Sequence, residues 1–222
     1  MGHMCGRFTI TATKPVIEKR FKAKFESSEY TPRYNAAPSQ MLPVILNTEP
    51  DKIKMVRWGL QPVWMQKKSG KKDGLINVRS ETLKEKHTFK SDLEKRRCLV
   101  LADGFYEWQK NPNGKKIPFR FTLKDKGLIA MAGLWEENEN GKNFAIITTT
   151  PNTLLAKVHN RMPVILEERT ESKWLDDALK YEEIIKILIP HTDKDMMGYA
   201  VSTTLNSAKF DSPALLNESV SK

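Results

Sequence analysis

The chain is built from short apolar runs separated by polar, turn-forming stretches, and long amphipathic repeats are few. Runs rich in β-branched and aromatic residues predict strands over 5–11, 41–47, 53–60, 97–109, 117–123, 128–135, 144–149, 163–166 and 199–203. Apolar residues at helical spacing predict helices over 15–25, 152–158, 171–179 and 181–189. Residues 30–40 and 61–74 are typical of loops.

The predicted strands cluster in the middle of the chain, and the helices flank them. Asn111-Pro112-Asn113-Gly114 indicates a tight hairpin, and a turn over 48–52 joins two earlier strands. Strands joined by such short turns pair in antiparallel fashion. We therefore expect an α+β fold with a mainly antiparallel sheet or barrel. Since no repeat or linker divides the chain, residues 5–222 are expected to form one domain.

The net charge of +10 is unevenly distributed. Residues 1–111 hold 22 Lys and Arg against 12 Asp and Glu, whereas residues 112–222 hold 15 of each. A basic field of this kind suits a polyanion such as nucleic acid. A lysine-rich surface that only keeps the protein in solution gives the same count, so both interpretations stay open here.

Two classes of protein are disfavoured by the pattern. No apolar run reaches the ~18 residues of a membrane span, and the N-terminus lacks the apolar core of a signal peptide. We therefore expect a cytoplasmic protein without a membrane partner.

The two cysteines, Cys5 and Cys98, cannot form a disulfide framework and lack the spacing of a zinc site. Cys98 lies in an apolar run, and we expect it in the core.

Cys5 has an unusual position. Residues 1–4 look like a cloning scar followed by a natural start methionine, and their removal would leave Cys5 with a free α-amine beside its thiol. The amine of such a residue has a pKa of about 8 and the thiol one of about 8.5. This aminothiol condenses with an aldehyde to an imine, and the sulfur then closes a thiazolidine ring; the thiol is also an acyl-transfer nucleophile. Judged by its position in the sequence alone, however, Cys5 is more often expected to be a terminal cysteine with no functional role.

Two other side chains offer acid–base chemistry. Strand alternation places Glu107 on the same face as Phe105, within an aromatic segment. A carboxyl packed against aromatic surface has a raised pKa, as a general acid requires, whereas a glutamate on an edge strand would face water. His159 lies just before a predicted strand and is the best acid–base candidate of the four histidines, although a lone histidine is more often structural. No residue supplies a second metal ligand at useful spacing, so we expect no metal.

Polar and aromatic residues in the basic half indicate a binding surface. Asn77 and Arg79 share one strand face and suit an anion or a carbonyl, although the wet face of a strand explains them equally well. Four of the aromatic residues in or beside this half are Tyr34, Trp58, Trp64 and Trp108. Aromatics interleaved with cations suit single-stranded nucleic acid, through base stacking and phosphate contacts. Core packing is the alternative, and we expect it for Trp58.

Eight motifs follow one another along the chain. They are Cys5-Gly6-Arg7-Phe8, Tyr34-Asn35-Ala36-Ala37-Pro38-Ser39-Gln40, Trp58-Gly59-Leu60 with Pro62 and Trp64, Asn77-Val78-Arg79-Ser80-Glu81-Thr82, Arg97-Cys98-Leu99, Asp103-Gly104-Phe105-Tyr106-Glu107-Trp108, Ala132-Gly133-Leu134-Trp135-Glu136 and His159-Asn160-Arg161-Met162-Pro163. In this order they resemble the SOS response-associated peptidase (SRAP) family, the abasic-site processing proteins, from Met4 to about Ser207. One motif alone is weak evidence, whereas eight in order are specific.

The resemblance implies a single α+β domain around a mainly antiparallel β-barrel-like core with flanking helices. It also implies covalent capture of abasic sites in single-stranded DNA by the N-terminal cysteine, with a thiazolidine cross-link that protects the site. The catalytic residues carried over are Cys5, Asn77, Glu107 and His159. The residues that the resemblance places near the DNA or its phosphates are Arg7, Pro38, Trp64, Arg79, Trp108, Thr148 and Arg161. We expect no cofactor, a monomer, and association with the nucleoid on DNA, and the sequence leaves open whether junctions with duplex are bound.

Two other functions stay open at the level of sequence. A thiol peptidase would use Cys5 together with His159 and Asn77, and its minimal form would remove the residues ahead of Cys5. A non-catalytic single-strand-binding module would fit the basic half and its aromatics, but it would leave Cys5, Glu107 and His159 without a role.

Overall fold

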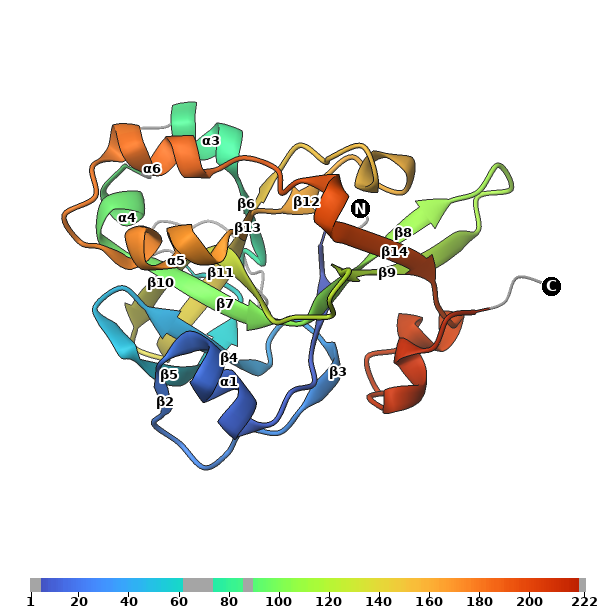
Figure 1. Ribbon diagram of the computed structural model, residues 1–222, viewed down its shortest axis with the longest axis horizontal. Helices are drawn as coiled ribbons and strands as arrows, with labels where there is room; N and C mark the ends of the chain where they lie inside the picture. The colour runs from blue at the N-terminus through green and yellow to red at the C-terminus, as the bar shows by residue number, and fades with distance from the viewer. Residues whose placement is uncertain (1–4, 62–73, 86–89, 220–222) are drawn as a thin grey trace.

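The computed structural model describes residues 5–61, 74–85 and 90–219 (Figure 1). Its strands are β1 (Arg7–Ile10), β2 (Lys24–Phe25), β3 (Arg33–Ala36), β4 (Met41–Leu46), β5 (Glu49–Trp58), β6 (Asn77–Arg79), β7 (Arg97–Ala102), β8 (Gly104–Lys110), β9 (Lys116–Leu123), β10 (Ile129–Asn138), β11 (Gly141–Thr149), β12 (Met162–Pro163), β13 (Ile165–Leu166) and β14 (Met196–Ala200). Its α-helices are α1 (Lys14–Phe21), α3 (Ser80–Glu85), α4 (Lys90–Lys95), α5 (Glu168–Leu175) and α6 (Tyr181–Ile187). Short 3₁₀ helices are η2 (Leu155–Lys157), η3 (Asp193–Asp195), η4 (Thr203–Asn206) and η5 (Pro213–Leu216).

Five strands form a closed barrel in the order β11–β10–β7–β4–β5, which returns to β11. The pairs within this ring are antiparallel except the closing pair of β5 with β11, which is parallel and sets Trp58 beside Phe144. The rings of these two residues stack at 6.2 Å inside the barrel, and both are fully buried, as is Cys98 on β7. The predicted α+β fold with a mainly antiparallel barrel is therefore confirmed, as are the core positions of Trp58 and Cys98.

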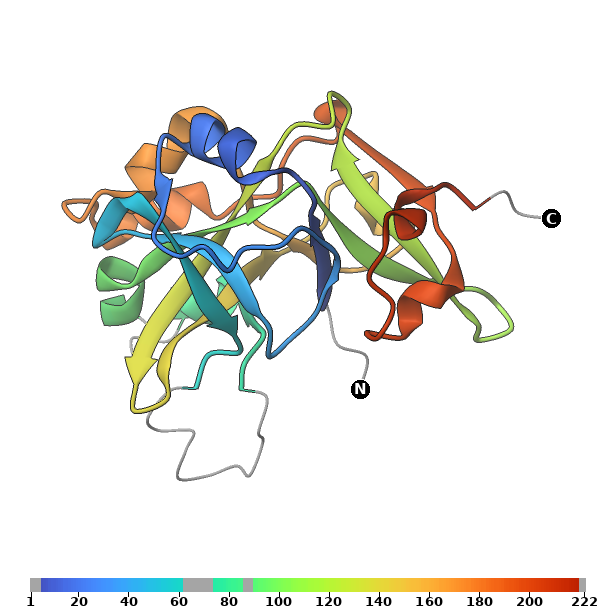
Figure 2. The ribbon, with the colours of Figure 1, turned by 90° about the horizontal axis from the view of Figure 1, so that it is seen from below.

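A second, antiparallel sheet has the order β14–β9–β8–β1–β3. Its β8–β9 hairpin projects from one end of the molecule, while α3, α4, α5 and α6 gather at the other (Figures 1 and 2). The Asn111–Gly114 turn closes this hairpin as predicted, with the Gly114 backbone N–H donating to the Asn111 carbonyl and Gly114 at a φ of +75°. The chain that follows β14, with η4 and η5, folds back beside this sheet (Figure 2).

The single strand predicted over 97–109 is wrong, because the chain changes sheets at Asp103. β7 belongs to the barrel and β8 to the second sheet. The Asp103 carboxylate accepts hydrogen bonds from the Thr9 hydroxyl, from the backbone N–H of Thr11 and from Arg120. These partners hold the bend, which turns β8 toward β1 and so brings the segment around Glu107 next to the start of the chain.

Other differences are local. The predicted loop over 30–40 contains β3, which Asp211 fastens from the far end of the chain by accepting the backbone N–H groups of Tyr34 and Asn35. The turn between β4 and β5 spans only residues 47–48, because the Asn47 side chain is tied to the Arg97 backbone N–H and the Trp135 indole.

The helix boundaries differ as well. The helix predicted over 15–25 ends at Phe21, because Lys22 adopts the left-handed conformation at a φ of +53°. Only the short η2 forms within 152–158, α5 begins and ends earlier than predicted, and the last strand covers 196–200 instead of 199–203. Helices α3 and α4 were not predicted, because each is short and has few apolar positions to set a helical period.

Candidate functional site

Cys5 lies directly before β1, against the strand that carries Glu107. β1 pairs antiparallel with β8, with Arg7 opposite Tyr106. The Cys5 backbone nitrogen donates a hydrogen bond of 2.6 Å to Glu107 Oε1. In the printed chain this nitrogen belongs to the peptide bond with Met4. Cys5 is 3% exposed and has a φ of +42°, a left-handed conformation that is uncommon for residues other than glycine and that is found preferentially at functional sites.

Glu107 is a buried carboxyl, with only 1% of its surface exposed. Burial raises the pKa of Glu107, and the nearby His159 and the donors on Cys5 oppose that rise. A raised pKa keeps a larger fraction of the carboxyl protonated near neutral pH, which is the state of a general acid. Of the two interpretations that the sequence left open for Glu107, the structure supports the buried carboxyl over the water-facing one.

His159 and Asn77 complete the contacts around this pair. His159 Nδ1 lies 3.8 Å from Glu107 Oε2, close enough for an electrostatic interaction and too far for a hydrogen bond. The Asn77 side-chain amide, on β6, donates to the Cys5 carbonyl oxygen at 3.5 Å. The four residues carried over as catalytic therefore come together, from the chain start, β6, β8 and the segment after η2.

The surroundings of the Cys5 thiol disfavour its thiolate form. Burial raises its pKa well above the ordinary value, and the charge of Glu107 and a hydrogen bond to that carboxyl raise it further. Arg161 opposes this effect. The sulfur therefore needs a proton acceptor when it attacks, and Glu107 is the hydrogen-bonded neighbour that can serve.

Arg79, Thr148 and Arg161 lie on the barrel side of the site. β6 runs parallel to β11 and places Arg79 opposite Thr148. Arg79 is exposed, whereas Thr148 is buried and Arg161 is 7% exposed. Arg161 Nη2 donates to the Thr148 carbonyl at 2.7 Å, and both terminal nitrogens bind the Glu81 carboxylate. The exposed Arg79 side chain can therefore bind an anion from solvent, whereas the Arg161 guanidinium already binds the Glu81 carboxylate.

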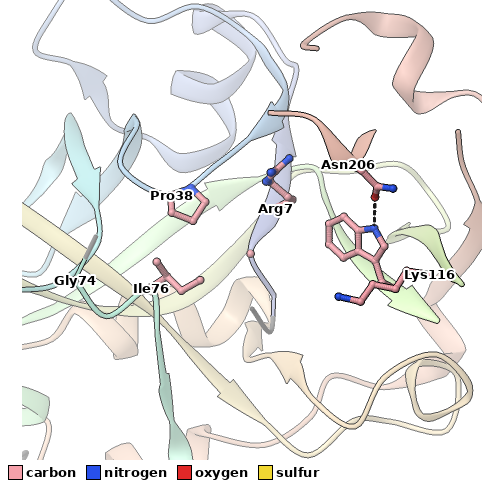
Figure 3. Close-up of a pocket in the computed structure, with 8 residues that line it drawn as sticks. Arg7, Pro38, Gly74, Ile76, Lys116 and Asn206 are labelled. Atoms are coloured by element: carbon pink, nitrogen blue, oxygen red, sulfur yellow. Dashed lines mark hydrogen bonds between the residues drawn. The ribbon is translucent and has the colours of Figure 1, made fainter. Parts of the chain in front are cut away.

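A cavity of about 490 Å³ opens beside Gly6, the residue after Cys5 (Figure 3). It is lined by Gly6, Arg7, Pro38, Gly74, Ile76, Trp108, Lys116 and Asn206. Three residues that the sequence predicted to contact DNA therefore meet here, namely Arg7, Pro38 and Trp108. Trp64, which was also predicted to contact DNA, lies outside the described residues.

Hydrogen bonds hold two walls of this cavity in place. The Trp108 indole donates to Asn206 Oδ1 at 2.7 Å. Arg7 Nη1 donates to Asn35 Oδ1 at 2.9 Å, and the Asn35 amide in turn binds backbone carbonyls of the C-terminal segment, among them that of Leu205. The C-terminal segment is therefore part of the cavity's construction.

Sequence reasoning missed Ile76, Lys116 and Asn206. Lys116 could have been found from the predicted hairpin. A turn at 111–114 pairs Lys116 with Lys110, which lies only two residues beyond Trp108 on the neighbouring strand. Asn206 follows the last predicted strand, and nothing near it in the sequence indicates its contact with Trp108. Among the described residues, no group of three or more His, Cys, Asp and Glu is arranged to hold a metal ion. In the same part of the chain, no helix has the length and apolarity to cross a membrane.

Comparisons with known proteins agree with this arrangement. The chain is 40% identical to "Abasic site processing protein YoqW" of Bacillus subtilis, over 96% of this chain and 99% of that protein. It is 30% identical to "Abasic site processing protein HMCES" of Pongo abelii, over 96% of this chain and 75% of that protein. A crystal structure of a protein from Bacteroides thetaiotaomicron superposes with a TM-score of 0.84 at 26% identity, over 97% of this chain and all of that one. Residues 4–208 match the family described as SOS response associated peptidase (SRAP), and the chain belongs to that family.

Proposed function

We propose that this protein captures abasic sites in single-stranded DNA covalently, through a thiazolidine formed by Cys5. The observation that carries the proposal is the 2.6 Å contact between the Cys5 nitrogen and the buried Glu107 carboxyl. The relatives named abasic site processing proteins support the substrate. The proposal requires that residues 1–4 are removed, so that this nitrogen becomes an α-amine.

The first step exposes an aldehyde. An abasic sugar is a cyclic hemiacetal, and its open form carries an aldehyde at C1′. Glu107, whose pKa is raised by burial, donates its proton from the acid form to the ring oxygen while the bond between C1′ and that oxygen opens. The hydroxyl proton on C1′ leaves to a base, for which His159 is the nearest candidate, so the step has no net change in protons.

The second step joins the protein to the sugar. The Cys5 amine attacks C1′, and loss of one water gives an imine. The Cys5 sulfur then adds to the same carbon, its proton passes through Glu107 to the nitrogen, and a five-membered thiazolidine closes. Aldehyde and aminothiol thus give thiazolidine and water, with no oxidant or reductant. Asn77, on the Cys5 carbonyl, holds the residue in the orientation that this ring closure needs.

The cavity beside Gly6 would hold the strand next to the reacting sugar. Trp108 and Pro38 offer flat surfaces to bases, and Arg7 and Arg79 offer charge to phosphates, as in proteins that bind single strands without reading sequence. Trp64, Thr148 and Arg161 keep their predicted places near the DNA in this proposal. We infer a monomer that acts in the cytoplasm at the nucleoid, on single strands and on their junctions with duplex.

A denaturing gel tests the proposal directly. Protein that begins at Cys5 is mixed with a single-stranded oligonucleotide carrying one abasic site, and with the same oligonucleotide carrying a normal base. We expect a slow-migrating covalent band only with the abasic strand, and none with Cys5→Ala. Binding of both oligonucleotides on a native gel without any covalent band would instead make the protein a strand-binding module.

One observation also favours self-processing as a second activity. The nitrogen held by Glu107 is the leaving-group nitrogen of the Met4–Cys5 peptide bond in the printed chain. An acid at this position can protonate that nitrogen while water adds to the Met4 carbonyl, which releases residues 1–4. Intact-mass measurement of purified protein over time tests this. We expect loss of residues 1–4 in the parent and retention in Glu107→Gln.

A further inference from the structure

Glu81 forms an ion pair with Arg161 that has no role in the proposed chemistry. It lies in the first turn of α3, directly after β6. Its carboxylate binds Arg161 at two points, with Oε1 accepting from Nη1 at 2.9 Å and Oε2 accepting from Nη2 at 2.8 Å. Such a fork-to-fork pair fixes the orientation of a guanidinium as well as its charge. The Glu81 side chain is 42% exposed, so one side of the pair faces solvent.

The same arginine holds His159 through its backbone. The Arg161 N–H donates to His159 Nδ1 at 3.2 Å, and that nitrogen lies 3.8 Å from Glu107 Oε2. A chain of contacts therefore runs from Glu81 through Arg161 to His159, and from there to Glu107.

The Glu81 carboxylate also occupies the Arg161 nitrogens that a phosphate would bind. Phosphate and carboxylate offer a guanidinium the same pair of acceptor oxygens, so they compete for the same nitrogens. Both terminal nitrogens of Arg161 face Glu81, and Nη2 also binds the Thr148 carbonyl at 2.7 Å. A DNA phosphate that approaches Arg161 must therefore displace Glu81 or be repelled by it.

We propose that Glu81 is a positioning residue that orients the Arg161–His159 segment for abasic-site capture and, by holding the same guanidinium, weakens the binding of DNA phosphate. The proposal rests on the proposed function for its first half only. It predicts two effects of opposite sign when the carboxylate is removed. Strand binding becomes tighter, because the competitor is gone. Capture becomes slower, because the segment that carries His159 is released.

The test compares Glu81→Gln with a matched control, Glu85→Gln. Glu85 lies at the end of the same helix, is exposed, and makes no ion pair with another described residue. Both variants change the net charge by the same amount. Two quantities are measured: the affinity for an intact single-stranded oligonucleotide, and the capture rate constant with saturating protein and an abasic strand. Thermal unfolding checks that each variant is folded.

For Glu81→Gln we expect about two- to fivefold tighter binding of the intact strand, the scale of one partly exposed ion pair. We expect capture at saturation to slow by about tenfold to a hundredfold, the scale on which a misplaced catalytic group acts. Glu85→Gln should change neither quantity by more than about twofold. Glu81→Asp keeps the charge on a shorter side chain and should restore part of the capture rate.

Three results would overturn the proposal. A parallel loss of affinity and rate in Glu81→Gln would make the residue structural. Parent values for both quantities would make it a bystander. Equal tightening by Glu85→Gln would reduce the effect to long-range charge. If the parent itself forms no covalent product, the proposed function fails, and the intact-strand affinity still decides whether Glu81 competes with phosphate.

Discussion

Glu107 contacts both reactive partners of the site, with Oε1 on the Cys5 nitrogen at 2.6 Å and Oε2 3.8 Å from the His159 ring. In the proposed chemistry, the two oxygens of this buried carboxyl face the nucleophile and the base. The carboxyl does not line the cavity beside Gly6 where the strand is proposed to lie, so we expect a substitution at Glu107 to change the chemistry and to leave strand binding unaffected.

In protein produced so that it begins at Cys5, Glu107→Gln should slow covalent capture by about 100- to 10,000-fold, the usual contribution of a positioned proton donor. The amide keeps the shape of the side chain but cannot donate a carboxylic acid proton. Affinity for an intact strand should stay within about twofold of the parent value, since no phosphate contact is lost. The measurement is the rate of adduct formation at several pH values, with binding measured separately.

The pH dependence of that rate has a defined sign. The pKa of Glu107 is raised, and in the proposed chemistry its acid form is the active one. Capture by the parent should therefore fall as the pH rises through this raised pKa. The gap between parent and Glu107→Gln should be smallest at low pH, where solvent acid substitutes in part. A variant that matches the parent throughout would leave Glu107 with a structural role only.

The same raised pKa predicts an effect on stability. Because the folded-state pKa of Glu107 lies above its unfolded value, the stability contributed by its protonated form is complete below the unfolded pKa and is lost as the pH rises through the folded pKa. Glu107→Gln removes this loss. The variant should unfold at a higher temperature than the parent at pH 8 and at a similar temperature at pH 4, as measured by calorimetry. Equal melting temperatures at both pH values would contradict a desolvated carboxyl.

Local patterns predicted much of the fold. The strands of the barrel and the hairpin at Asn111–Gly114 follow from alternation and turn chemistry, which act over a few residues, whereas the burial of Glu107 was one of two interpretations left open. The break at Asp103 could not be predicted in this way. Its partners, among them Thr9, lie far away in sequence, and a polar residue between two apolar runs looks the same whether the strand continues or turns.

The sequence indicated which residues could form the site, but it did not indicate the long-range contacts that join them. Cys5, Glu107 and His159 suggest their chemistry one by one, and their grouping came from the resemblance to a family. The Glu81–Arg161 fork joins residues 80 positions apart, and the Trp108–Asn206 hydrogen bond joins residues 98 apart. Such contacts depend on how the sheets pack, so no spacing in the sequence reports them.

Trp108 should carry stacking energy in strand binding. Its ring lines the cavity, and its indole N–H is oriented by Asn206. Trp108→Ala should weaken the binding of an intact single strand by about 1–3 kcal/mol, the range found for base–aromatic stacking. Trp108→Phe keeps a stacking surface and should retain most of the affinity. Equal losses for both variants, measured by fluorescence anisotropy, would assign the effect to the hydrogen bond with Asn206 instead of to stacking.

Cations around the cavity should set the salt dependence of binding. Arg7 and Lys116 line the cavity, and Lys116 is exposed on the projecting hairpin (Figures 1 and 3). Replacing either by alanine should flatten the slope of log affinity against log salt by about 0.7, the value for one phosphate contact on a single strand. Lys186→Ala is the matched control, because α6 lies at the opposite end of the molecule from this hairpin (Figures 1 and 2). A slope unchanged in all three variants would make the basic surface a solubility feature.

The proposed chemistry depends on the state of one nitrogen, which gives the sharpest prediction. With residues 1–4 attached, the Cys5 nitrogen is an amide, its lone pair is delocalised into the carbonyl, and it cannot form an imine. Protein that begins at Cys5 should therefore cross-link an abasic strand, and protein that retains residues 1–4 should not. The two forms carry the same cavity residues and should bind an intact strand with similar affinity. The experiment compares covalent yields on a denaturing gel after the intact mass of each form has been verified. Equal covalent yields from the two forms would exclude the α-amine of Cys5 as the group that captures the aldehyde.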